Sequence, residues 1–243
     1  MDQLTILAAS GMRSRIESLE LIANNLSNAA TAGYKADREF FNLYQSAEAN
    51  TDSVQPVIER NWIDFSQGLL IETRSPLDVA LSGNGFFVVE SPNGLLYTRN
   101  GSFRVSKKGL LETREGYPVR AAGPDRVIRI SPDDPRPIEI KPDGEVTREG
   151  QVLGRLQVAG ITGPDVVAKH GENYFRLVNP KGLLARSTAE VHQGKIEASN
   201  VGPAESAVRL ISVLRQFEML QRAALLGAEM NRRAIEEVAR VQG

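Results

Sequence analysis

The chain lacks cysteine altogether and has only two histidines, His170 and His192, among its 243 residues. The absence of cysteine excludes disulfides, thiolate metal sites and a cysteine nucleophile. A metal site needs at least three ligands, and a histidine acting as general acid or base needs an oriented partner. Two isolated histidines satisfy neither requirement. We therefore expect a chain that is not an enzyme, with no cofactor and no small-molecule substrate.

An excess of charge of one sign and long apolar runs are lacking too. The 29 basic residues balance 30 acidic ones, so no net field attracts nucleic acid or an anionic membrane. Apolar runs such as 85–89 are far shorter than the roughly 20 residues that span a bilayer. The N-terminus also lacks the basic region of a cleaved signal peptide. We expect no nucleic-acid partner and no transmembrane segment, and the residues alone favour the cytoplasm.

Apolar residues recur three or four positions apart from residue 2 to about residue 32, which predicts an amphipathic helix. They are Leu4, Ala8, Met12, Ile16, Leu19, Ala23 and Leu26. Gly33 can end the helix. Asn24, Asn25 and Asn28 cluster near that end, although asparagine is a poor helix former. Two interpretations stay open for them: a hydrogen-bond ladder between subunits that fixes register, or a solvated polar face.

A second, longer helix is predicted from about Gly202 to Val241, with Pro203 in its first turn. Its seam alternates three and four residues apart, as in a coiled coil. The seam consists of Ala207, Leu210, Leu214, Phe217, Gln221, Ala224, Ala228, Asn231, Ile235 and Val238. Gln221 and Asn231 admit the same two interpretations as the asparagines. Glutamates 205, 218, 229 and 236 each have an arginine four residues on, a spacing that supports a helix.

Between the helices, glycine turns cut the chain every seven to nine residues from about residue 77 to 116, and the pattern continues to residue 184. Pairs such as Asn93-Gly94 supply the positive φ angles of tight hairpins. This pattern of short apolar stretches between glycine turns predicts an all-β central body, an antiparallel meander or a barrel-like structure. Residues 45–60 are polar and aperiodic, which is typical of a linker or extended arm.

The predicted fold is therefore α+β, in four segments. They are an N-terminal helix (1–35), a linker or arm (36–76), a β-rich body (77–195) and a C-terminal coiled-coil helix (196–243).

The two helices carry narrow apolar stripes that two helices alone cannot cover fully. We expect them to pack against each other and against neighbouring copies of the chain. A head-to-tail contact of this kind builds an open helical polymer unless it closes into a ring. The expected assembly residues are Leu19, Asn24, Asn25, Leu26, Asn28, Leu210, Leu214, Phe217, Gln221 and Asn231. A coiled-coil dimeric adaptor with a ligand-binding β body stays open as an alternative.

Five stretches of the chain resemble motifs of one known protein family, and they occur in the same order as in that family. Residues 22–35, Ile-Ala-Asn-Asn-Leu-Ser-Asn-Ala-Ala-Thr-Ala-Gly-Tyr-Lys, resemble the N-terminal signature of the flagellar rod and hook axial proteins. Residues 76–80, 85–89, 97–103 and 196–201 resemble later motifs of that family. The resemblance spans nearly the whole chain.

The resemblance implies a structural subunit of the bacterial flagellar basal-body rod. Its partners would be copies of itself, other rod proteins and the flagellar type III export apparatus, which exports such subunits without a cleaved signal. It would assemble in the periplasm, which overturns the cytoplasmic expectation above. Terminal helices of relatives form the inner core of a hollow, torque-transmitting rod. The short connection before Pro76 favours the proximal rod type, with the distal rod or a hook-family protein as the alternative.

Overall fold

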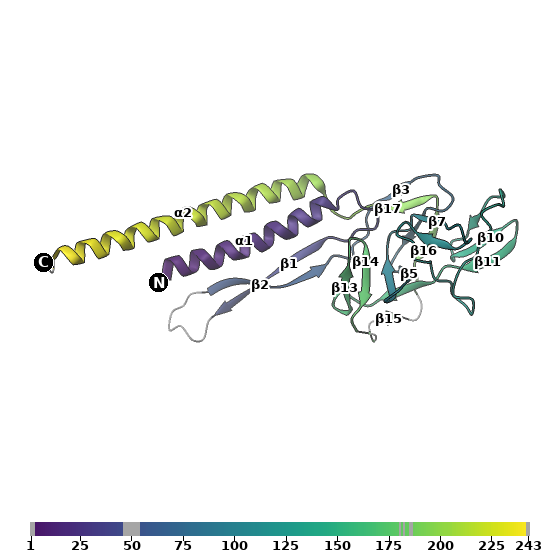
Figure 1. Cartoon of the computed structure of the whole chain (residues 1–243), viewed down its shortest axis with the longest axis horizontal. Coiled ribbons are helices and arrows are strands. Elements are labelled where there is room, and N and C mark those ends of the chain that lie inside the picture. Colours follow the sequence, from purple (N-terminus) through teal and green to yellow (C-terminus); the bar gives the residue numbers. More distant parts are fainter. Residues whose placement is uncertain (1–2, 46–53, 180, 182, 185–186, 242–243) are drawn as a thin grey trace. The chain divides into compact units, whose positions relative to one another are not determined.

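A computed structural model describes residues 3–45, 54–179, 181, 183–184 and 187–241 of the chain. The predicted α+β class is confirmed: two long terminal helices pack together, and the rest of the chain forms small antiparallel sheets (Figure 1). The chain divides into two compact units. Unit 1 comprises residues 1–27, 37–62 and 202–243, and unit 2 comprises residues 28–36 and 63–201.

Unit 1 is built around two helices, α1 (Gln3–Ser27) and α2 (Pro203–Val241). They lie side by side and antiparallel, and the last turns of α2 run past the start of α1 (Figure 1). The bounds of α2 agree with the prediction, because Pro203 opens the helix where its missing N–H costs no hydrogen bond.

The first helix is shorter than predicted, because it ends at Ser27 and not near residue 32. Asn28 begins a turn instead. The Thr31 amide donates to the Asn28 carbonyl (3.1 Å), and the Thr31 hydroxyl donates to the Asn28 side-chain oxygen (3.2 Å). Short polar side chains compete with the helix for main-chain groups in this way. Gly33, with φ of 71°, serves this later turn and does not cap the helix directly.

The predicted linker contains regular structure. Strands β1 (Asp37–Gln45) and β2 (Val54–Ile63) form a two-stranded sheet in the part of the chain where an arm or linker was expected. Residues 46–53, the middle of the polar stretch, lie outside the described residues. The division of the chain into four segments stays a prediction.

Unit 2 contains the remaining strands in several small sheets, and each pairing with a described register is antiparallel. A six-stranded sheet has the order β13 (Val167–His170), β14 (Tyr174–Leu177), β6 (Gly94–Thr98), β5 (Phe86–Ser91), β12 (Val158–Ile161), β15 (Leu183–Leu184). A three-stranded sheet has the order β11 (Gln151–Arg155), β10 (Glu145–Arg148), β9 (Glu139–Ile140). Three pairs complete the unit: β16 (Glu190–Gln193) with β4 (Val79–Ser82), β17 (Lys195–Glu197) with β3 (Leu70–Glu72), and β7 (Phe103–Val105) with β8 (Leu111–Thr113). One turn of 3₁₀ helix, Pro164–Val166, precedes β13.

Several predicted glycine turns do join neighbouring strands. Gly94 lies in the β5–β6 hairpin and Gly109 between β7 and β8, both with positive φ. The β10–β11 turn uses Glu149 and Gly150, with φ of 47° and 81°, the pattern of a type I′ turn. These hairpins are pieces of separate sheets and not one continuous meander, because β12, β14 and β15 enter the main sheet from far along the chain.

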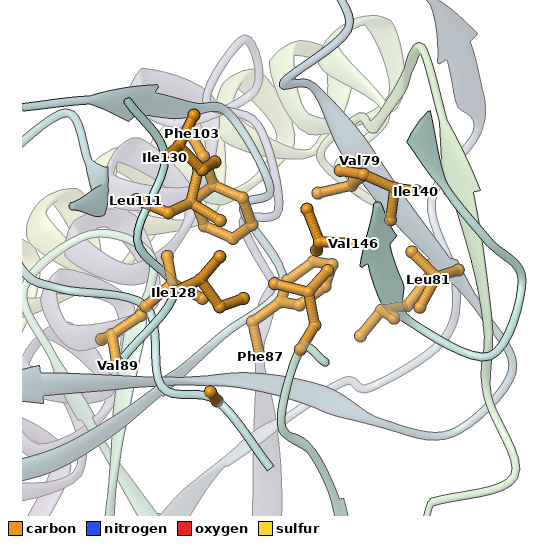
Figure 2. Packing of buried hydrophobic residues seen from close by; sticks show 14 of the residues in the cluster. Val79, Leu81, Phe87, Val89, Phe103, Leu111, Ile128, Ile130, Ile140 and Val146 are labelled. Carbon is orange, nitrogen blue, oxygen red and sulfur yellow. The ribbon is translucent and has the colours of Figure 1, made fainter. Parts of the chain in front are cut away.

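The apolar run in β5 is buried on both faces of its sheet. Phe87 and Val89 join one core cluster, whereas Phe86 and Val88 join a second. A strand covered on both sides reads as a continuous apolar run and not as an alternating one. Figure 2 shows the first cluster. Its labelled side chains are Val79, Leu81, Phe87, Val89, Phe103, Leu111, Ile128, Ile130, Ile140 and Val146.

Neither of the two long helices, over the residues that the structure describes, is apolar enough to cross a membrane.

Candidate assembly surface and junction clasp

One face of α2 is buried or half-buried along a row of positions that alternate four and three residues apart. The row, called the α2 seam below, is Ser206, Leu210, Val213, Phe217, Leu220, Ala224, Gly227 and Asn231. This is the spacing of a coiled-coil seam, and α2 packs along α1. Leu210, Phe217 and Asn231 lie on this row, and their role in assembly stays a prediction.

Three other positions of the predicted seam, Leu214, Gln221 and Ala228, are exposed in the isolated chain, and their role in assembly stays a prediction. Val213 is 6% exposed, whereas its neighbour Leu214 is 42% exposed. A three-and-four alternation can be drawn through either of two adjacent stripes on this helix. Where apolar residues stand side by side, the spacing alone does not say which one turns inward.

The buried face of α1 changes in character along the helix. Ala8, Ser14 and Ser18 are buried in its first two thirds and are small, whereas the large side chains of Leu21 and Ile22 are buried nearer its end. A Cβ atom added to Gly11 would lie 3.2 Å from Cδ1 of Leu220, so the two helix backbones approach closely at this point. Residues without bulky side chains permit such an approach.

The apolar stripe predicted for α1 therefore matches its buried face only in part. Leu19 and Leu26 are half-buried, whereas Ile16 is 45% exposed and Ala23 is exposed. Ser14 and Ser18 are buried where the predicted stripe has larger apolar residues.

The outward side of α2 carries a second set of apolar side chains, which we call the outer stripe. It consists of Val208, Ile211, Leu214, Met219, Leu225, Leu226 and Met230. These side chains are 42% to 70% exposed in the isolated chain. Extended apolar surface of this kind is typical of an interaction site.

The three asparagines of α1 and its following turn differ in environment. Asn25 is buried, and its side chain makes two hydrogen bonds with the main chain of Asp37: Nδ2 donates to the carbonyl (2.7 Å) and Oδ1 accepts from the amide (2.9 Å). Asn25 thereby ties α1 to the start of β1. Asn28 shapes its turn, whereas Asn24 is exposed.

The glutamate–arginine pairs predicted along α2 form in part. Glu229 and Arg233 make the expected ion pair. Arg209 instead donates to Glu39 of β1 over 2.9 Å, which fastens α2 to the β1–β2 sheet of the same unit. Because Glu39 is only 2% exposed, this bond is better shielded than the surface pairs on the helix.

Unit 2 contains a buried group of charged side chains at Lys35, Arg99 and Glu197. Lys35 Nζ donates to Glu197 Oε1 (2.6 Å) and to the Ser66 carbonyl (2.6 Å). Arg99 Nη1 donates to the other carboxylate oxygen (3.2 Å), and the Gly68 amide donates to Oε1 (3.0 Å). The Lys35 and Glu197 side chains are 0% exposed and that of Arg99 is 3% exposed. One buried carboxylate thus receives bonds from two cations and an amide.

Arg99 fixes this group to the body of unit 2. Its Nη2 donates to the Gly83 carbonyl (2.6 Å), its Nη1 also reaches the Leu81 carbonyl (3.4 Å), and its guanidinium lies 5.1 Å from the centre of the Phe86 ring. Burial lowers the pKa of both Lys35 and Arg99, and attraction to Glu197 opposes that shift.

Asn200 extends the network through its side-chain amide. Oδ1 accepts from the Ala36 amide (2.7 Å), and Nδ2 donates to the carbonyls of Asp64 (2.8 Å) and Ser66 (3.2 Å). We call the side chains of Lys35, Arg99, Glu197 and Asn200 the junction clasp.

The junction clasp joins three chain segments, 31–36, 63–69 and 197–200. Main-chain hydrogen bonds connect the same segments: the Gly33 amide to the Glu197 carbonyl, the Asp64 amide to the Ala36 carbonyl and the Ala198 amide to the Leu69 carbonyl, each 2.8 Å. Every pair of segments is therefore bonded directly. Gly33 permits this packing, since a Cβ there would lie 2.3 Å from the Asn100 nitrogen.

Comparisons with known proteins agree with this geometry. The flagellar hook protein FlgE/F/G D1 domain matches residues 80–148, and the flagellar basal body rod FlgEFG protein C-terminal region matches residues 192–237. The flagellar basal-body rod protein FlgF of Caulobacter vibrioides is 32% identical over 254 residues, covering 99% of this chain and all of that protein. The chain belongs to the flagellar basal-body rod family. It is thus a structural, non-enzymatic protein of the basal-body rod, and family membership implies polymerisation with rod proteins.

Other rod-family relatives match nearly as well. The flagellar basal-body rod protein FlgG of Agrobacterium fabrum is 33% identical over 257 residues, covering 92% of this chain and 95% of that protein. The FlgG protein of Buchnera aphidicola subsp. Schizaphis graminum is 32% identical over 244 residues, covering 88% and 91%. At these identities, the family is shown and the subtype within it is not.

The rod-family signature at residues 22–35 gains a physical meaning from the structure. Sequence reasoning used Lys35 and the 196–201 motif only as marks of resemblance. It missed that Lys35 bonds to Glu197 and that the Asn200 side chain accepts from the Ala36 amide. A usable signal was present: Lys35 and Glu197 are the only charged residues of the two otherwise uncharged motifs at 22–35 and 196–201.

Unit 2 also has an open groove of about 910 Å³, lined in part by Arg120, Asp143, Arg155 and Glu190. Charges of both signs lie along it. In the described part of the chain, no three His, Asp or Glu side chains are grouped so that they could hold a metal ion. The groove therefore offers no arrangement that points to a reaction.

Proposed function

We propose that this chain is a subunit of the proximal part of the flagellar rod and polymerises through its terminal helices into the hollow shaft that transmits motor torque. It is exported by the flagellar type III apparatus and assembles in the periplasm with copies of itself and with other rod proteins. The outer stripe is the observation that carries the proposal, because its apolar side chains need a partner outside the subunit.

The assembly surface divides into two parts with different roles. Leu210, Phe217 and Asn231 hold the helix pair together inside the subunit, because they lie on the α2 seam. Leu214, a member of the outer stripe, and the exposed Gln221 face neighbouring copies. On the first helix, Asn24 and the half-buried Leu19 and Leu26 complete the contact between subunits.

The proximal assignment rests on the short connection before Pro76 and on the full-length match to the FlgF relative. The distal rod is the second candidate, and the FlgG relatives of similar identity support it. Electron microscopy of basal bodies that carry a tagged copy of this chain distinguishes the two. Label near the membrane end of the rod supports the proximal assignment, label toward the hook supports the distal one, and basal bodies without label refute both.

Leu214→Asp tests the outer stripe directly. We expect this change to abolish incorporation into rods, because each contact between copies would have to bury a carboxylate. Val152→Asp is the matched control, since it introduces the same group at an exposed apolar position on β11 of unit 2, outside the outer stripe. The measurement is the amount of each variant in basal bodies purified from cells that carry no other copy.

Normal incorporation of Leu214→Asp would contradict the role of the outer stripe. Concentration-dependent sizing of the purified chain adds a second check. A discrete dimer that persists on dilution and never grows would favour a coiled-coil adaptor over a rod subunit.

A further inference from the structure

The chain crosses between its two units at four peptide links: 27–28, 36–37, 62–63 and 201–202. These crossings adjoin the chain segments 28–36, 63–69 and 197–201 of unit 2. Any force that passes along the backbone from α1, from the β1–β2 sheet or from α2 therefore enters unit 2 through these segments.

The segments at the crossings are the ones that the junction clasp joins. Lys35 lies in the first, Ser66 in the second, and Glu197 and Asn200 in the third, while Arg99 attaches the group to the main sheet. A pull on one segment is thus shared by the other two and by the body of unit 2. We propose that the junction clasp is a mechanical joint within unit 2, which spreads the force that enters at these crossings over all three segments and the main sheet.

The chemistry of the junction clasp suits this role better than it suits stability alone. A buried ion pair contributes little net stability compared with an apolar replacement, because removing charges from water is costly. Its bonds are directional, however, and here they exclude water, which would otherwise exchange with a stretched hydrogen bond. Directional, water-free bonds between all pairs of segments resist sliding, which apolar contacts do not.

Single-molecule pulling on the full chain tests the joint. Since the chain has no cysteine, Ala30→Cys and Ala204→Cys provide two specific attachment points at exposed positions on either side of the clasp segments. In this background Asn200→Ala removes the side-chain hydrogen bonds to Ala36, Asp64 and Ser66 without leaving a buried charge. We expect a lower rupture force and an opening rate at zero force that is raised about tenfold.

Two further variants sharpen the measurement. Glu197→Gln should lower the rupture force more than Asn200→Ala does, and Arg136→Gln should leave it unchanged, because Arg136 pairs with Asp134 and Glu149 at the surface of the same unit. Circular dichroism establishes that each variant is folded before it is pulled. If Glu197→Gln does not fold, Asn200→Ala decides. A rupture force equal to that of the parent chain would overturn the mechanical joint.

The role of the joint in transmitting torque rests on the proposed function, whereas the pulling result does not. In cells, Asn200→Ala should assemble rods but swim more slowly than the parent strain in viscous medium, where motor load is high. Equal swimming by a variant that ruptures easily would overturn the torque role. Absence of the parent chain from basal bodies would instead refute the proposed function and leave the measured joint standing.

Discussion

At the scale of residues, the junction clasp combines two cations with one carboxylate in a site that excludes water. Glu197 is central, because Lys35 and Arg99 both bond to it. Lys35 has a second acceptor in the Ser66 carbonyl, and Arg99 has one in the Gly83 carbonyl. Removing the charge of Glu197 should therefore lower the stability of unit 2 more than removing the charge of Lys35.

Glu197→Gln should destabilise unit 2 by roughly 3 to 5 kcal/mol, because it leaves two buried cations without a counter-charge. Lys35→Met should cost less, since the Arg99–Glu197 pair survives and the surplus cation is removed. Urea unfolding monitored by the tyrosine signals of unit 2 measures both, with Arg136→Gln as the surface control. A larger loss for Lys35→Met than for Glu197→Gln would contradict this account of the clasp.

The sequence shows the residues of the junction clasp but does not show that they contact one another. Lys35 and Glu197 are 162 residues apart, and the sequence of one chain holds no sign that two such residues meet. Local features are easier to predict from the sequence, because the turn at Asn28 and the positive φ of Gly33 follow from the chemistry of asparagine and glycine. Contacts distant in sequence depend on the packing of the whole unit.

At the scale of elements, period and turn signals predicted the existence of both helices and of several hairpins. The residues facing inward were less predictable. Where Val213 stands beside Leu214, either can occupy the seam, and the choice depends on how the facing helix lies. The small face of α1, with Gly11 opposite Leu220, decides that geometry.

Gly11→Leu should separate the helix pair and lower the stability of unit 1 by about 1 to 3 kcal/mol, because the new side chain must displace Leu220. Leu220→Ala alone should also destabilise the pair, by leaving a cavity. The double variant should recover part of the loss, since the added and removed volumes offset each other. Thermal melts of the parent chain, the two single variants and the double variant, followed by the helix signal, give the coupling energy between residues 11 and 220. Strictly additive losses would show that the two residues do not pack together.

At the scale of the whole molecule, the two units have separate cores. The α2 seam belongs to unit 1, whereas the apolar clusters around Phe86 and Phe87 belong to unit 2. Molecules built of more than one compact unit often unfold in more than one step. We therefore expect the helix signal and the tyrosine signal of unit 2 to change at different temperatures.

Phe217→Asp separates these contributions and links them to assembly. Phe217 is half-buried on the α2 seam, so an aspartate there removes a large apolar contact and places a carboxylate against α1. The helix transition should lose about 3 kcal/mol or more of stability, while the tyrosine transition of unit 2 stays in place. Incorporation into rods should also fail, because the helix pair no longer presents an ordered outer stripe.

Met219→Asp is the control for Phe217→Asp, because the same carboxylate then lies at a position that is 61% exposed. It should leave both melting transitions unchanged and still prevent incorporation, since only the contact between copies is affected. Thermal circular dichroism at helix and tyrosine wavelengths, together with analysis of purified basal bodies, measures all three effects. An unchanged helix transition in Phe217→Asp would remove Phe217 from the seam. A single transition in which both signals coincide would show that the two units unfold as one, because each then depends on the other for its stability.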